Sequence, residues 1–385
     1  MKAASRLNGI GEYYFSQKLR EIEQLKAAGK PVINLGIGSP DLPPHESVIL
    51  ALQQTGSLAT SHAYQGYKGV PALRKAMADW YQNWYHVTLN PDTDILPLLG
   101  SKEGIMHICM TYLDEGDQVL VPNPGYPTYR ASVKLAGGEC VEYDLKEENQ
   151  YRPDFEKLEK SGLKKVKLMF VNYPHMPTGQ QADRQLMEDV VTFARENDIL
   201  VVHDNPYSFI LNEHPQSLLS IPGAEGYVLE LNSLSKSHNM AGWRVGMLCG
   251  SEERIAEVLK FKSNMDSGMF LPVQLAAIKA LELGNDWYNT VNNTYRSRRD
   301  KAYELLDLLK CRYSKEQVGM FLWAAVPSQS KDGYALSDEI LYNADVFITP
   351  GGIFGTAGDG YIRISLCSSE QTMQTAIDKI RAVIK

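Results

Sequence analysis

The amino-acid sequence predicts an α/β protein whose larger part is a mostly parallel sheet covered by helices on both faces. Three observations support this prediction. Short apolar runs alternate with amphipathic segments between residues 95 and 249. Polar residues follow directly after several of these runs. A second, smaller set of apolar runs follows a long helical stretch, between residues 318 and 366. Buried parallel strands are short, apolar and joined by helices, so the first pattern is typical of such a sheet.

Length and composition narrow the class of protein. The chain has 385 residues, of which 44% are hydrophobic and 22% are charged. It exceeds the size at which single cores stop growing, so we expect two domains of unequal size. The net charge of −7 argues against a nucleic-acid or anionic-membrane surface. No apolar run approaches the roughly 18 residues of a membrane span, and we expect no secretory signal at the N-terminus.

The cysteines indicate neither a metal site nor a disulfide framework. They are odd in number and far apart, without the C-x-x-C spacing of zinc and redox sites. They are Cys109, Cys140, Cys249, Cys311 and Cys367. The first three stand in apolar surroundings, where small core residues are expected. A reducing cytoplasm is the expected location.

The N-terminal region predicts two helices. Residues 11–29 place Phe15, Leu19 and Ile22 on one helical face. Residues 64–70 form a glycine-rich loop that opens a second helix, because the proline that follows suits the first helical turn. The large apolar side chains of that second helix indicate a core face.

Between these helices, a G-x-G pattern at Gly36 and Gly38 invites comparison with dinucleotide-binding loops. The third glycine of that fingerprint is missing, since Asp41 stands there, and prolines occupy the place where a helix should open. We therefore reject a Rossmann site. A strand leading into a tight loop remains, in which glycine lets backbone amides approach a ligand.

A polar group follows each of several predicted strands of the sheet. We expect strands at residues 95–99, 118–122, 139–143, 166–171, 199–203, 227–231 and 245–249. Ligands of parallel sheets bind at the carboxyl ends of the strands. The groups found there are Ser101, Tyr126, Asn172, Asp204 with Tyr207, and Lys236. Their convergence predicts one site.

The stretch 227–246 is the most informative of the chain. Lys236 stands in a polar loop and is flanked by Ser233, Ser235 and Ser237. Arg244 follows eight residues later. A lysine amine can form a Schiff base, serines can donate to phosphate oxygens, and arginine can hold them with a fork of donors. The pattern suits an aldehyde cofactor that carries a phosphate. A solvated loop lysine is the alternative that this stretch alone leaves open.

Two further residues each admit two interpretations. Ser101 opens a predicted helix after a glycine, which makes either a phosphate seat or an ordinary N-cap. Arg363 alternates with apolar neighbours in the strand-like run 361–366. It faces either a buried anionic partner or, on an edge strand, water.

The C-terminal region predicts a small α+β domain. A long helical stretch runs from about 251 to 310 and is interrupted near 267–272. Strand-like runs and a closing amphipathic helix then occupy residues 318–326, 346–350, 361–366 and 370–384.

Taken together, these stretches resemble the class I/II aminotransferases, the fold-type-I pyridoxal-phosphate enzymes. The matching segments are Ser-Leu-Ser-Lys236 with Arg244, Asp204-Asn-Pro-Tyr207, Pro-His-Met-Pro-Thr-Gly179 and Arg363, in the family's order. Gly-Ser-Lys-Glu-Gly, Pro-Gly-Tyr-Pro and Ser-Asn-Met-Asp-Ser-Gly look most like the diaminopimelate and alanine aminotransferase branch. The resemblance implies a large cofactor-binding domain at 45–280 and a small domain built from 1–44 and 281–385.

The resemblance also implies roles around pyridoxal 5′-phosphate. Lys236 would form the internal aldimine and then move a proton between the substrate Cα and the cofactor. Asp204 would pair with the pyridine nitrogen, Tyr207 would donate to O3′, and Tyr126 would stack on the ring. The phosphate would be held by Ser101, the backbone of Lys102, Ser233 and Arg244, with Ser235 and Asn172 also at the cofactor.

Substrate and partner roles follow from the same resemblance. Arg363 would hold the substrate α-carboxylate, with Asn172 and the Gly38 backbone nearby. Tyr64 would reach the phosphate of a neighbouring subunit in a homodimer with shared active sites. Met176 departs from the family pattern, because it replaces the asparagine that hydrogen-bonds O3′. A thioether cannot donate a hydrogen bond, so we expect a raised pKa of the Lys236 Schiff base.

The expected activity is transfer of the α-amino group of an L-amino acid to a 2-oxo acid. A carbon–sulfur β-lyase on the same fold is the alternative, because the two share these motifs. A cofactor-binding regulator is a third possibility, although no basic N-terminal DNA-binding module is visible. The substrate side chain is not predicted; specificity would come from loops near residues 10–20, 38–42, 267–271 and 353–357.

Overall fold

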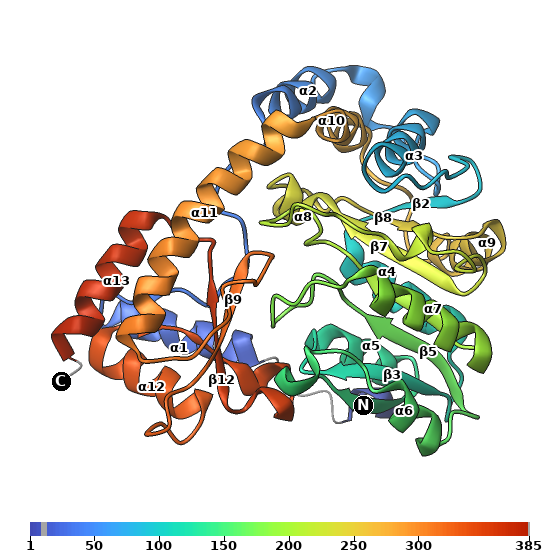
Figure 1. Cartoon of the computed structure of the whole chain (residues 1–385). Coiled ribbons are helices and arrows are strands. Elements are labelled where there is room, and N and C mark those ends of the chain that lie inside the picture. The colour runs from blue at the N-terminus through green and yellow to red at the C-terminus, as the bar shows by residue number, and fades with distance from the viewer. Residues whose placement is uncertain (9–13, 384–385) are drawn as a thin grey trace.

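The short apolar runs form one seven-stranded sheet in the computed structural model, which describes residues 1–8 and 14–383 (Figure 1). The strand order is β2-β8-β7-β6-β5-β3-β4. The bounds are β2 (Ile95–Leu98), β3 (Gln118–Asn123), β4 (Glu139–Asp144), β5 (Val166–Val171), β6 (Leu200–Asp204), β7 (Val228–Ser233) and β8 (Gly246–Cys249). Neighbouring strands are parallel except where β8 pairs with β2 and β7. The predicted mostly parallel sheet is confirmed.

Helices cover both faces of this sheet because successive side chains of a strand point to opposite sides. In β5, Leu168 and Phe170 pack in one apolar cluster with α4, α5 and α9. Met169 and Val171 pack on the other face with α6 and α7. The bounds are α4 (Ser101–Tyr112), α5 (Pro127–Leu135), α6 (Phe155–Ser161), α7 (Arg184–Asn197) and α9 (Glu252–Lys262). The central strands are therefore buried on both sides, as their unbroken apolar character predicts.

A smaller α+β unit contains most of the C-terminal residues. Its antiparallel sheet has the order β11 (Thr349–Pro350), β12 (Tyr361–Ser365), β9 (Phe321–Ala325). Its helices are α11 (Asn285–Leu308), α12 (Gly333–Ala344) and α13 (Glu370–Val383). The N-terminal segment joins it, since β1 (Ile33–Asn34), which follows α1 (Tyr14–Ala27), pairs with β10 (Val346–Phe347). The division at residues 44/45 and 280/281 remains a proposal.

The remaining helices lie at the β2 end of the large sheet and at its site edge. α2 (Glu46–Gly56), α3 (Pro71–Tyr85) and α10 (Leu271–Leu281) gather beyond β2, at the top of Figure 1, while α8 (Leu234–Ser237) directly follows β7. Within the described part of the chain, no helix has the length and apolar character needed to cross a membrane.

The structure corrects several expectations. The interpretation of Arg363 as a water-facing edge residue is wrong, because β12 is the central strand of its sheet and Arg363 is 4% exposed. Cys140 is half-buried on the edge strand β4 and is not a core residue. Helices α2, α5 and α12 were not predicted. Parts of two predicted helices, residues 11–13 and 384, lie outside the described residues.

Strand direction places the predicted site residues at one edge of the large sheet. β2, β3, β5, β6 and β7 all run the same way, because β2 and β7 are both antiparallel to β8. Their carboxyl ends therefore meet at the same edge. Asn172 follows β5, Asp204 ends β6, and Ser233 ends β7 just before Lys236.

Candidate active site

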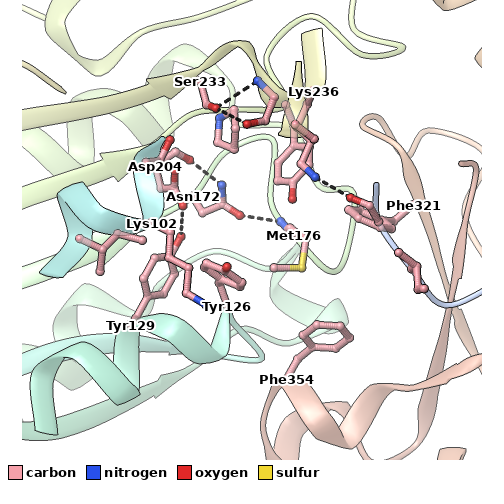
Figure 2. A pocket seen from close by; sticks show the side chains of 18 of the residues that line it. Lys102, Tyr126, Tyr129, Asn172, Met176, Asp204, Ser233, Lys236, Phe321 and Phe354 are labelled. Carbon is pink, nitrogen blue, oxygen red and sulfur yellow. Dashed lines mark hydrogen bonds between the residues drawn. The ribbon is translucent and has the colours of Figure 1, made fainter. Parts of the chain in front are cut away.

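A cavity of about 550 Å³ lies at this edge of the sheet and takes residues from both parts of the chain. It is lined by nearly all predicted site residues: Gly38, Ser101, Lys102, Tyr126, Asn172, Met176, Asp204, Tyr207, Ser233, Ser235, Lys236, Arg244 and Arg363. Figure 2 shows how several of them converge. Tyr64 is the exception, because it lies outside this lining and its side chain is 92% exposed.

Lys236 is half-buried, and its amine points into the cavity from the short helix α8. Its Nζ donates a hydrogen bond to the backbone oxygen of Gly38 (Figure 2). Burial lowers the pKa of this amine. Gly38 has no room for a side chain, since an added Cβ would lie 2.4 Å from Cζ of Phe321. A lysine with a lowered pKa is a better nucleophile and base near neutral pH. The position of Lys236 in the cavity also excludes the alternative interpretation, in which it is a solvated loop lysine.

Asp204 has one carboxylate oxygen that is satisfied and one that is not. Oδ2 accepts a hydrogen bond of 2.8 Å from the hydroxyl of Tyr129 (Figure 2). Oδ1 is buried and has no hydrogen-bond partner among the described residues. Burial raises the pKa of Asp204 to about 6, against the hydrogen bond from Tyr129 and the nearby charge of His203. A buried oxygen without a partner is costly, and the N–H of a protonated ring would satisfy it.

His203 forms a buried polar network on the opposite face of the sheet from Asp204. Its Nδ1 lies 2.7 Å from Oε2 of Glu230, and its Nε2 lies 3.0 Å from the carbonyl oxygen of Tyr173. Glu230 also accepts hydrogen bonds from Ser217, the Leu218 amide and Tyr81. Both ring nitrogens therefore face acceptors, and this network holds the residue that precedes Asp204 in a fixed orientation.

Hydrogen-bond donors that could bind an anion surround the N-terminus of α4. Gly100 has φ of 90°, and a Cβ added there would lie 2.1 Å from Nη2 of Arg244, so glycine is required. Ser101 begins the helix, whose first amides lack intrahelical partners. The Oγ atoms of Ser233 and Ser235 lie 2.8 Å apart, and Nη1 of Arg244 lies 3.5 Å from the second. Amides, hydroxyls and a guanidinium in one cavity fit a phosphate group.

Asn172 and Met176 connect the two sides of the cavity. The amide of Asn172 donates to the backbone oxygen of Asp204 at 2.5 Å and accepts from the Met176 N–H at 2.7 Å. The sulfur of Met176 lies 3.3 Å from Nη1 of Arg363, whose Nη2 donates to the Gly36 oxygen at 2.9 Å. The side chain that replaces the family's asparagine therefore faces the cavity and contacts the predicted carboxylate-binding arginine.

Several lining residues were not found from the sequence. Tyr129 stands one helical turn after Tyr126, and the unpredicted helix α5 would have placed both on one side. Phe15, Phe321 and Phe354 come from separate segments, so no local pattern signals them.

The chain is similar to known proteins over nearly its whole length. The family model for aminotransferase class I and II matches residues 30–380. The LL-diaminopimelate aminotransferase of Dehalococcoides mccartyi strain BAV1 is 40% identical over 99% of this chain and 98% of its own. That of Natranaerobius thermophilus is 39% identical over 99% of each chain.

The fold of the chain is also similar to solved structures. Apo-BacF from Bacillus subtilis superposes with a TM-score of 0.95 and 34% identity, over 100% of this chain and 99% of that one. The carbon–sulfur β-lyase alternative finds no support among these relatives. The buried Asp204 oxygen, the cavity-facing Lys236 amine with its lowered pKa, and the anion donors at the N-terminus of α4 together fit pyridoxal phosphate. The chain belongs to the class I and II aminotransferase family, and it is a pyridoxal-phosphate-dependent aminotransferase that moves the amino group of an amino acid to a 2-oxo acid.

Proposed function

We propose that amino-group transfer takes place in this cavity, with Lys236 as the residue that moves the proton. Pyridoxal phosphate, when bound, supplies an electron-withdrawing ring that stabilises negative charge at the substrate Cα. The amine of Lys236 would take the proton from the substrate Cα and deliver it to the cofactor. It would move a proton in the opposite direction when the 2-oxo acid is converted to an amino acid. Burial lowers the pKa of this amine, which suits it to act as a base near neutral pH. The unpartnered Oδ1 of Asp204 in the same cavity is the observation that carries the proposal.

The other lining residues hold and orient the cofactor in this proposal. Asp204 accepts the ring N–H and keeps it protonated. Tyr207 donates from its hydroxyl to the ring O3′, and burial, which raises the pKa of that hydroxyl, keeps the proton in place. Tyr126 would lie against the ring. The phosphate would be held by residues that line the cavity: Ser101, the Lys102 amide, Ser233, Ser235 and Arg244.

Arg363 holds the α-carboxylate of the substrate in this proposal. Its guanidinium is buried and lies over the ring of Phe321 at 3.9 Å. A buried guanidinium binds a carboxylate strongly, since two parallel hydrogen bonds match the planar group. Asn172 and the backbone of Gly38 complete this side of the cavity.

The visible absorption of the purified protein with pyridoxal phosphate tests the proposed function. An L-amino acid donor should abolish the yellow band, and a 2-oxo acid should restore it. A band that no donor changes would contradict amino transfer. Release of pyruvate and ammonia from a cysteine conjugate, without any 2-oxo acid, would instead identify a lyase.

Replacement of Met176 by asparagine should lower the pH midpoint at which the visible spectrum of the holoenzyme changes. Asparagine would donate a hydrogen bond to the ring oxygen and favour its ionised form, whereas the thioether has no donor. The midpoint is read from a spectral pH titration. Met176→Leu, which also lacks a donor, is the control and should keep the midpoint of the unmodified protein. An unchanged or higher midpoint in Met176→Asn contradicts the argument.

We also propose a homodimer in which Tyr64 contacts the phosphate in the second subunit. The loop that carries Tyr64 is firmly anchored. Lys262, which is buried, donates to the Tyr67 oxygen at 3.0 Å, and Gln274 accepts from the Val70 amide at 2.8 Å. Four other apolar residues of this domain are also exposed: Leu50, Leu58, Met265 and Phe270. A fixed, exposed tyrosine and exposed apolar residues suit an interface between copies of the chain.

Replacement of Tyr64 by phenylalanine should weaken pyridoxal phosphate binding about tenfold, the value of one hydrogen bond to a charged group. Cofactor titration by fluorescence measures the Kd. The matched control is Tyr67→Phe, on the same loop and 48% exposed, which should leave the Kd unchanged. A monomer in light scattering, or equal Kd values for both variants, would contradict the shared site.

The free cysteines support a reducing, cytoplasmic location, which we also propose.

A further inference from the structure

The cavity has a polar side and an apolar side. The polar side carries the residues that we propose to hold the cofactor. The apolar side, or apolar wall, is built from α1, the β1–α2 connection, β9 and the connection between β11 and β12. It consists of Phe15, Leu19, Ile37, Phe321 and Phe354. Figure 2 shows Phe321 and Phe354 away from Asp204, across the cavity.

Aromatic rings enclose the guanidinium of Arg363. Its Cζ lies 3.9 Å from the ring centre of Phe321, 4.6 Å from that of Phe354 and 5.8 Å from that of Phe15. The sulfur of Met176 faces Nη1 of the same group. A substrate whose α-carboxylate meets Arg363 must therefore place its side chain among apolar groups.

Charge on the apolar side is confined to Arg363 among the described lining residues. The other charged residues of the described lining are Lys102, Asp204, Lys236 and Arg244, which the proposed function assigns to the cofactor and to proton transfer. A second carboxylate or an ammonium on the substrate side chain would lose its water without gaining a partner of opposite charge among the described residues of the apolar side. An aromatic ring would instead replace water with contacts to Phe321 and Phe354, where ring pairs add to the benefit of burial.

We propose that this chain prefers amino donors with a large apolar side chain, aromatic before aliphatic, over donors whose side chain is charged. This inference rests on the proposed function, because it assigns Arg363 to the α-carboxylate. It separates this chain from what the names of its relatives say of them, since LL-diaminopimelate carries a second amino and carboxylate group. Met176, Phe321 and Phe354 are then the residues that select the substrate.

The first test compares donors in the half-reaction of the holoenzyme, followed by loss of the visible band. L-phenylalanine should react at least tenfold faster, as kcat/KM, than L-glutamate or LL-diaminopimelate, with L-leucine between them. Faster reaction of either charged donor overturns the preference and leaves amino transfer intact. No reaction with any donor overturns amino transfer, and the preference with it.

A second readout does not depend on turnover. Calorimetric titration of the holoenzyme with the unreactive acids 3-phenylpropanoate and glutarate compares the same two side-chain classes. The phenyl acid should bind at least tenfold more tightly. Equal or tighter binding of glutarate would contradict the claim that the apolar side binds the substrate side chain.

A charge added to the apolar side should weaken the preference. Leu19→Arg places a guanidinium on the apolar side, so the ratio of kcat/KM for L-phenylalanine to that for L-glutamate should fall at least tenfold. Val383→Arg adds the same charge on the exposed end of α13, outside the cavity lining, and should leave the ratio unchanged. An unchanged ratio in Leu19→Arg overturns the assignment of this wall to the substrate. If that variant does not fold, the donor and acid comparisons on the unmodified protein still decide.

Discussion

Replacement of Lys236 by alanine should lower the rate of amino transfer by at least about 10⁴-fold, the upper range for loss of an acid–base group. The amine faces the cavity, its pKa is lowered, and the described cavity lining offers one other lysine, Lys102. The backbone of Lys102 belongs to the entrance of α4, and its side chain is exposed. Among the described lining residues, Lys236 is therefore the amine that we expect to move the proton at the substrate Cα.

Steady-state kinetics with donor and 2-oxo acid measure the effect of Lys236→Ala. The control is Lys75→Ala, because Lys75 is exposed on α3 and pairs with Asp79. The control should keep its activity within about twofold, since surface substitutions are nearly neutral. A Lys236→Ala enzyme within tenfold of the unmodified protein would show that another group moves the proton.

Replacement of Asp204 by asparagine should reduce kcat/KM roughly 10²- to 10³-fold, as expected when a buried charge pair is broken. Asparagine can still accept the hydrogen bond of Tyr129, but it cannot hold a positive charge on the ring nitrogen. The same change should weaken cofactor binding. Asp79→Asn, on the exposed face of α3, is the matched control and should change neither quantity.

The same substitution should stabilise the cofactor-free protein in a defined pH range. Burial raises the pKa of Asp204 to about 6, so folding favours its protonated form. This contribution is fully present below the ordinary pKa near 4 and is lost as pH rises through about 6. Two pKa units correspond to about 3 kcal/mol. Asp204→Asn should therefore have a free energy of unfolding about 3 kcal/mol higher at pH 7.5, and the difference should vanish below about pH 4.

Urea unfolding of both cofactor-free proteins across that pH range measures this difference. A constant difference at all pH values would mean that the carboxyl group of Asp204 does not titrate as its burial requires. A lower stability of Asp204→Asn at pH 7.5 would mean that its charge is satisfied in the cofactor-free fold.

Much of the site could be predicted because strand direction alone brings it together. Asn172, Asp204 and Lys236 follow strands that the hydrophobic pattern marks clearly, and parallel strands end at the same edge. The aldehyde and phosphate chemistry of the Lys236 loop was visible for the same reason, since its side chains are close in sequence. The prediction for Tyr64 concerns a second subunit and stays a prediction.

The rest could not be predicted because it depends on how distant segments pack. The sequence left open whether Arg363 faces water, and only the pairing of β12 with both β9 and β11 makes it a buried residue. The contact between Met176 and Arg363 joins residues 187 positions apart. The apolar wall likewise draws Phe15, Phe321 and Phe354 from different segments, and no local periodicity records such a meeting.

The most direct test of the central claim is to locate the cofactor on the chain. The holoprotein is reduced with borohydride, digested, and mapped by mass spectrometry for peptides that carry a pyridoxyl group. The structure predicts a single modified residue, Lys236, and no modification once an excess of amino donor has been added beforehand. Modification of another lysine, or none at all, would contradict the assignment of this cavity as the place where the amino group is transferred.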